Sequence, residues 1–254
     1  MQITQSAVVR GIGGFFAMSL DTMRFTFSRP VQVREFFDQS WFIARVSTIP
    51  TMLVALPFTV LVTFILNILL REIGATDLSG AGAALGAITQ IGPMVTVLIV
   101  AGAGATAICA DLGARTIREE IDAMSVLGID PVRRLVVPRV WASMFVALLL
   151  NGLVCVIGIL GGFVFSVFLQ GANPGAFISQ ITLLTGLGDL VISEIKAGMF
   201  GLLAGLVACY RGLSVHGGPK SVGEAVNETV VYAFMGLFVI NVIVTAVGIK
   251  ATAG

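Results

Sequence analysis

Five long stretches of this sequence contain no Asp, Glu, Lys or Arg, and they leave the chain few ways to fold. They are residues 46–70, 78–110, 140–188, 197–210 and 229–249. A membrane-spanning helix needs about 20 apolar residues, because the hydrocarbon offers no water to satisfy charges or open backbone. Only 11% of the residues are charged, whereas about a quarter are charged in a soluble domain. The sequence therefore predicts an all-α protein that crosses a membrane several times.

The charge-free stretches predict five transmembrane helices. We expect them over about 46–70, 88–110, 140–169, 190–210 and 229–249. The Gly- and Ala-rich segment 78–86 is expected to form a loop ahead of the second span. The turn residues 171–175 are expected to end the third span.

Basic residues predict which side each loop faces. If the segments before, between and after alternate spans share one side, that side holds Arg10, Arg24, Arg29, Arg34, Arg45, Arg115, Arg118, Arg133, Arg134, Arg139, Arg211 and Lys220. The other side holds only Arg71 and Lys250. Loops rich in Lys and Arg stay in the cytoplasm. The amino terminus is therefore predicted to be cytoplasmic and the carboxyl terminus to lie outside.

The first 45 residues differ from the spans. Apolar residues recur at helical spacing between Val33 and Ala44, with charges on the other faces, and a second aromatic-rich piece lies between Phe15 and Phe27. Pro30 separates the two pieces. The pattern favours amphipathic helices in the membrane interface over soluble helices packed on a partner. We therefore expect an interfacial part, 1–45, and a five-span domain, 46–254.

A dense charged block, Asp111 to Arg139, separates the second and third spans. Within it, an apolar stripe at helical spacing is formed by Ile117, Ile121, Met124 and Leu127. The stripe predicts a short cytoplasmic helix parallel to the membrane. Such a helix can dock into a groove of another protein, with its charges fixing the register. A solvated loop helix held by ion pairs is the alternative.

The block also carries a long motif, DLGARTIREEIDAMSVLGIDP at 111–131, continued by Leu135 and Pro138-Arg139. It resembles the signature of the MlaE/YrbE permeases, the membrane subunits of ABC-type lipid transporters that work with Mce-domain proteins. The sequence is most similar to YrbE subunits of Mce systems in bacteria with a mycolate envelope. The resemblance covers nearly the whole chain.

The resemblance implies a role and a set of partners. Segment 112–127 would be the coupling helix that sits in a cleft of a cytoplasmic ATPase. The residues expected to couple to the ATPase are Asp111, Arg115, Arg118, Glu119, Glu120 and Asp122. The expected partners are a second permease subunit, identical or a paralogue, the ATPase, Mce-domain proteins and a lipid substrate, with no nucleic acid. The chain would lie in the bacterial plasma (inner) membrane.

The residues of this chain do not suggest catalysis. The segment Gly217 to Ser221 lacks the spacing of a phosphate-binding loop, and Pro219 removes a backbone N–H donor from it. His216 is the only histidine, so no histidine cluster can hold a metal. We therefore expect no cofactor or metal in this chain and ATP hydrolysis in a separate subunit.

Two charged residues, Glu194 and Lys196, fall inside the fourth predicted span. Charge at membrane depth is costly and points to function, so both are candidates for the substrate path, with Lys196 as a contact to a lipid headgroup. Snorkelling to the outer interface is the alternative. Two other classes of protein remain open: a secondary transporter or channel, and a membrane scaffold.

Overall fold

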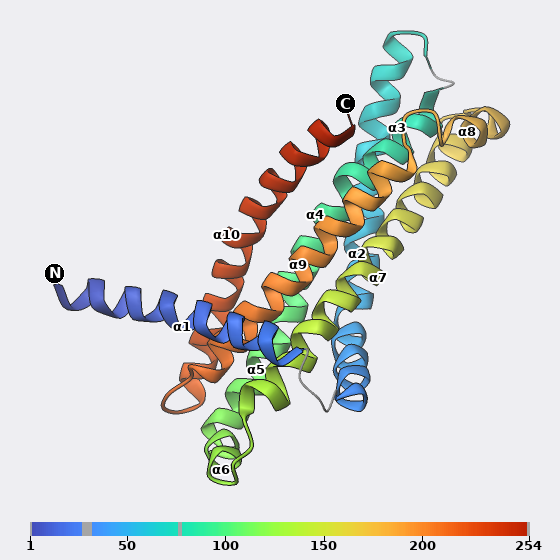
Figure 1. Ribbon diagram of the computed structural model, residues 1–254. Helices are drawn as coiled ribbons and strands as arrows, with labels where there is room; N and C mark the ends of the chain where they lie inside the picture. The colour runs from blue at the N-terminus through green and yellow to red at the C-terminus, as the bar shows by residue number, and fades with distance from the viewer. Residues whose placement is uncertain (1, 27–31, 76–77, 253–254) are drawn as a thin grey trace.

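The computed structural model describes every residue except 1, 27–31, 76–77 and 253–254, and within the described residues it is all helical. Figure 1 shows one elongated bundle with α6 at one end and α3 and α8 at the other. The α-helices are α1 (Gln2–Thr26), α2 (Val33–Glu72), α3 (Ser79–Leu85), α4 (Gly92–Ile99), α5 (Ala105–Ile117), α6 (Glu120–Val126), α7 (Val137–Val164), α8 (Pro174–Gln180), α9 (Leu187–Leu213) and α10 (Pro219–Thr252). Four π-helical segments join some of them: η2 (Gly86–Ile91), η3 (Val100–Gly104), η4 (Val132–Val136) and η5 (Phe165–Leu169).

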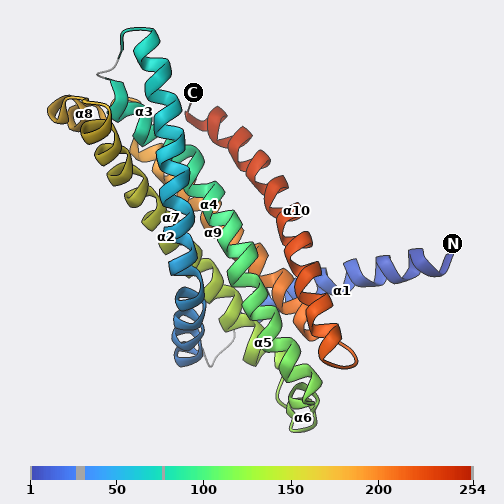
Figure 2. The same cartoon turned by 180° about the vertical axis from the view of Figure 1, so that it is seen from behind.

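Five helical stretches in the described residues are long and apolar enough to cross a membrane, which confirms the predicted all-α architecture with five candidate spans. They are Val33–Glu72, Ser79–Ile117, Val132–Leu169, Leu187–Leu213 and Pro219–Gly248. The last of them, α10, packs on α9 and α5 along one side of the bundle (Figure 2).

Two predicted boundaries are wrong. Segment 78–86 is almost entirely helical and starts the second span. Its small residues allow close packing, because a Cβ on Gly80 would clash with the carbonyl oxygen of Phe177 in α8. The helix that carries the third span begins at Val132, ahead of the predicted residue 140, because the Asp130 carboxylate accepts a hydrogen bond of 2.8 Å from the backbone N–H of Val132 and caps the helix start.

The amino-terminal region forms two helices. The residues predicted to form an interfacial helix, 33–45, are continuous with the first span in α2, which contains Pro50 and Pro57. The upstream helix α1 crosses the bundle near η4 and the end of α9 (Figure 1). Its attachment includes a hydrogen bond of 2.8 Å from the Tyr210 hydroxyl to the carbonyl oxygen of Gly11. Pro30, predicted to separate the two helices, lies outside the described residues.

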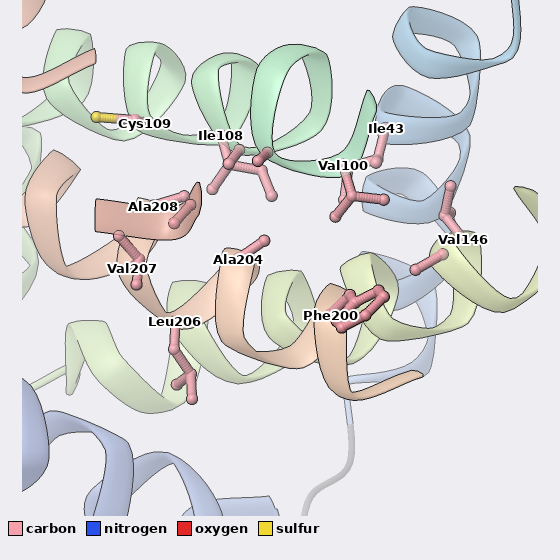
Figure 3. Packing of buried hydrophobic residues seen from close by; sticks show 14 of the residues in the cluster. Ile43, Val100, Ile108, Cys109, Val146, Phe200, Ala204, Leu206, Val207 and Ala208 are labelled. Atoms are coloured by element: carbon pink, nitrogen blue, oxygen red, sulfur yellow. The ribbon is translucent and has the colours of Figure 1, made fainter. Parts of the chain in front are cut away.

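The core lies where α9 meets α7 on one side and α4 and α5 on the other. Figure 3 shows Phe200 and Ala204 of α9 facing Val100 and Ile108. On the face of α9 that contacts α7, glycines take the place of larger residues. A Cβ on Gly201 would lie 2.5 Å from the carbonyl oxygen of Ser143. Small residues let apolar helices approach closely in membranes. The tightly packed α9 thus connects the two ends of the bundle.

Candidate functional site

The charged block forms a bent segment at the α6 end of the bundle, and we call residues 111–129 the elbow. Helix α5 ends at Ile117, and α6 starts only at Glu120. Between them Glu119 adopts a left-handed conformation (φ 59°, ψ 15°), which costs a non-glycine residue about 1–2 kcal/mol. The predicted single helix over 112–127 is therefore wrong. The left-handed residue ends α5 and turns the chain, as such residues commonly do after a helix.

A buried ion pair joins the elbow to the start of α7. Nη2 of Arg139 lies 2.7 Å from Oδ2 of Asp111, and Nη1 donates to the carbonyl oxygen of Leu135 at 3.1 Å. The Arg139 side chain has no exposed surface, so it needs such partners to offset its desolvation. Arg139 was not among the predicted site residues. Arg139 directly precedes the charge-free stretch 140–188. A basic residue so close to a span needs an acidic partner, and this was the signal in the sequence.

Weaker ion pairs cross the bend. Arg115 pairs with Asp111 at 3.3 Å and approaches Glu120 at 3.9 Å. Arg118 pairs with Glu120 at 3.2 Å. These side chains are partly exposed, and such pairs contribute at most about 1 kcal/mol each. Only the two contacts with Glu120 link α5 to α6 across the bend, because Asp111 and Arg115 both lie in α5.

The outer surface of the elbow carries both charge and apolar area. We call it the elbow face, and it comprises the exposed residues Arg118, Glu119, Asp122, Val126, Leu127 and Ile129. Val126 is 87% exposed and Leu127 is 74% exposed. Three residues of the predicted docking stripe, Ile117, Ile121 and Met124, instead pack against this chain's own core. The stripe was therefore assigned to the wrong surface, except for Leu127.

The elbow is also fixed to the two carboxyl-terminal helices. The hydroxyl of Thr116 donates to the carbonyl oxygen of Gly212 at 3.1 Å. A Cβ on Gly212 would lie 2.8 Å from Cβ of Leu112, and one on Gly113 would lie 3.2 Å from Val215 and Val222. These contacts join the elbow directly to α9 and to the start of α10.

Glu194 and Lys196 lie on different faces of α9, where they border different cavities. Oε1 of Glu194 accepts a hydrogen bond of 3.0 Å from Asn151, and the side chain borders an apolar groove between α7 and α9. Lys196 is only 5% exposed and borders a separate cavity of about 130 Å³, which has both polar and apolar lining residues. Its side chain lies inside the bundle and does not extend over the surface of the chain.

Known proteins resemble this chain over most of its length. A family model described as Permease MlaE matches residues 36–247. A probable ABC transporter permease protein of Synechocystis sp. is 33% identical over 66% of this chain and 64% of its own length. The intermembrane phospholipid transport system permease protein MlaE of Haemophilus influenzae is 28% identical over 71% of this chain and 69% of its own length. The chain thus spans slightly less than two thirds of the Synechocystis relative.

Proposed function

Because the chain belongs to the MlaE permease family, we propose that it is the membrane subunit of an ATP-driven ABC transporter that moves lipids or fatty acids across the cell envelope. The observation that carries the proposal is the family match over 36–247, which takes in nearly all of the five candidate spans. The names of the Synechocystis and Haemophilus relatives support an ABC permease and a phospholipid substrate.

The elbow face is the proposed docking surface for the ATPase. It lies at one end of the bundle (Figure 1), where a cytoplasmic subunit can reach it. Exposed Val126 and Leu127 offer apolar area to a cleft, while Glu119, Asp122 and Arg118 fix the register. Of the other predicted coupling residues, Asp111, Arg115 and Glu120 hold the elbow in shape. ATP would be hydrolysed by that partner.

The remaining partners follow from the motif at 111–131. They are a second YrbE-type permease subunit, identical or a paralogue, and Mce-domain proteins on the other side of the membrane. In the bacterial inner membrane the α6 end would face the cytoplasm together with the amino terminus. The carboxyl terminus would lie outside, and Glu194 and Lys196 would belong to the substrate path.

Reversal of one charge on the elbow face tests the coupling role. Glu119→Lys is expected to reduce ATP-dependent lipid movement at least tenfold in vesicles that contain the purified complex, because it reverses a charge at the docking surface. Glu119→Gly removes the charge but keeps the left-handed backbone without strain. Glu224→Lys is the matched control, because Glu224 is 65% exposed and lies outside the elbow.

Size-exclusion profiles and expression like those of the wild type would show that each variant is folded. Normal transport by Glu119→Lys at native expression would refute the coupling role. Lipid movement that needs no ATP would favour a secondary transporter or channel, and absence of movement with intact partner binding would favour a scaffold.

A further inference from the structure

Lys196 is a buried charge without a counterion in the described part of the chain. Its side chain is 5% exposed, and no described residue forms an ion pair or hydrogen bond with it. The other buried basic residue, Arg139, has Asp111. Burying an unpaired ammonium costs several kcal/mol. A ligand with negative charge would offset that cost.

The cavity beside Lys196 provides further hydrogen-bond donors. It lies between η2, α9 and α10 and opens to the surface, where Gln90 is exposed. Its polar lining residues are Thr89, Gln90, Asp189, Ser193, Lys196 and Thr245. The hydroxyls of Thr89 and Thr245 already donate to carbonyl oxygens of their own helices. Ser193 accepts a hydrogen bond from Asn151 at 3.0 Å, and its hydroxyl also interacts with the Cys155 thiol of α7. Lys196 and the Gln90 amide are therefore the available donors.

Asp189 does not neutralise the Lys196 ammonium. Both residues lie on one face of α9, seven positions apart, and no ion pair joins them. Its Oδ2 accepts a hydrogen bond of 3.0 Å from the backbone N–H of Gly186 at the start of α9. The carboxylate is thus engaged at the helix end, whereas the lysine lies two turns deeper.

The size of the cavity limits what it can hold. Its volume of about 130 Å³ is several times the roughly 10–15 Å³ that one water needs by the same measure. A phosphate or carboxylate group fits this space, but a whole lipid does not. Two of the lining residues lie in the π-helix η2, a distortion of the helix that is frequent at functional sites.

We propose that Lys196 and Gln90 form an oxyanion-binding site for a phosphate or carboxylate group, inside a single subunit between η2, α9 and α10. The ammonium and the amide both donate to the anion. That the anion belongs to a lipid headgroup rests on the proposed function. The site lies apart from the apolar groove at Glu194, so the two charged residues would line different parts of the substrate path.

Matched lipids that differ only in charge test the site. Dioleoyl phosphatidic acid and dioleoylglycerol share their tails, and only the first carries an oxyanion. Binding of each to the purified complex would be measured without ATP by native mass spectrometry and by the shift in melting temperature. Lys196→Met is expected to weaken phosphatidic acid binding at least tenfold and to leave dioleoylglycerol binding unchanged, because a charge-assisted hydrogen bond is lost.

Three further variants serve as controls. Lys196→Arg keeps the charge and is expected to retain part of the binding. Gln90→Ala should weaken binding less than Lys196→Met does. Lys220→Met should have no effect, because Lys220 is 93% exposed outside the cavity. The ligand-free Lys196→Met protein is expected to melt no lower than the wild type, since it loses an unpaired buried charge.

Inorganic phosphate separates the two sources of the anion. If phosphate displaces phosphatidic acid and stabilises only proteins that retain a basic residue at position 196, the site also takes free anions. If phosphate has no effect, the site is specific for a headgroup. Equal binding of phosphatidic acid by the wild type and Lys196→Met would overturn the site but leave ATP-driven transport untouched. Conversely, if binding depended on Lys196 but the complex showed no ATP-dependent transport, the result would contradict the proposed function and leave the binding site supported.

Discussion

Arg139 shows how a single buried side chain connects two spans. Its guanidinium has no exposed surface and pairs with Asp111 at 2.7 Å, which joins the middle of α5 to the start of α7. Its Nε is buried without a hydrogen-bond partner in the described structure. The pair therefore balances a desolvation cost and adds little net stability, but loss of one partner leaves the other charge unpaired.

A double-mutant cycle on this pair should reveal strong coupling. Asp111→Asn is expected to lower the free energy of unfolding by about 3 kcal/mol, because it leaves the Arg139 charge buried without its counterion. Asp111→Asn combined with Arg139→Met should recover most of that loss. Unfolding of the purified protein would be followed in detergent, with Asp122→Asn on the exposed side of α6 as the control. Equal instability of the single and double variants would show that the pair is not coupled.

The sequence revealed the acidic partner of this pair but not the basic one. Both residues belong to the recognisable motif, but only Asp111 was predicted as a site residue, because Arg139 was counted among the basic residues of a cytoplasmic loop. Its burial depends on how α5 and α7 pack, which spacing along the chain does not show. The same applies to Lys196, whose position in a span was visible but whose cavity depends on η2 and α10.

At the scale of elements, charge-free length predicted the five spans, but local composition misplaced some of their ends. The glycines and alanines of 78–86 suggested a loop, and the packing of Gly80 against α8 makes most of that segment helical. At the elbow, the regular apolar spacing from Ile117 to Leu127 suggested one helix. The left-handed backbone at Glu119 could not be predicted from the sequence, because Glu is not a residue that favours this conformation.

The contact between α7 and α9 depends on the absence of a side chain at Gly201. A methyl group there would lie 2.5 Å from the carbonyl oxygen of Ser143 and 2.7 Å from Cβ of Ala147. Gly201→Ala is therefore expected to destabilise the protein by about 1–3 kcal/mol, the usual cost of overpacking. The measurement is thermal unfolding in detergent.

Gly161→Ala in α7 is the matched control. Its added methyl would lie 3.7 Å from Thr59, an ordinary contact, so the unfolding temperature should stay the same or rise through better helix propensity. If both variants melted like the wild type, the two helices would not need the close approach seen here.

For the whole molecule, the five candidate spans place the α6 end and the α8 end on opposite sides of the membrane. A single span, Val132–Leu169, separates the two. The basic residues lie mostly in the loops of the α6 end, which predicts that this end is cytoplasmic. The native cysteines, Cys109, Cys155 and Cys209, are all buried and should give little background in labelling experiments.

Single introduced cysteines at the two ends test this orientation. Ser179 in α8 and Ser125 in α6 are both exposed. In cells whose outer envelope alone is permeabilised, a membrane-impermeant maleimide is expected to label Ser179→Cys, and to label Ser125→Cys only after the plasma membrane is broken. The reverse pattern would mean that the permease is inserted the other way up. Labelling of both from outside would mean that Val132–Leu169 does not cross the membrane, since one crossing must separate the two positions.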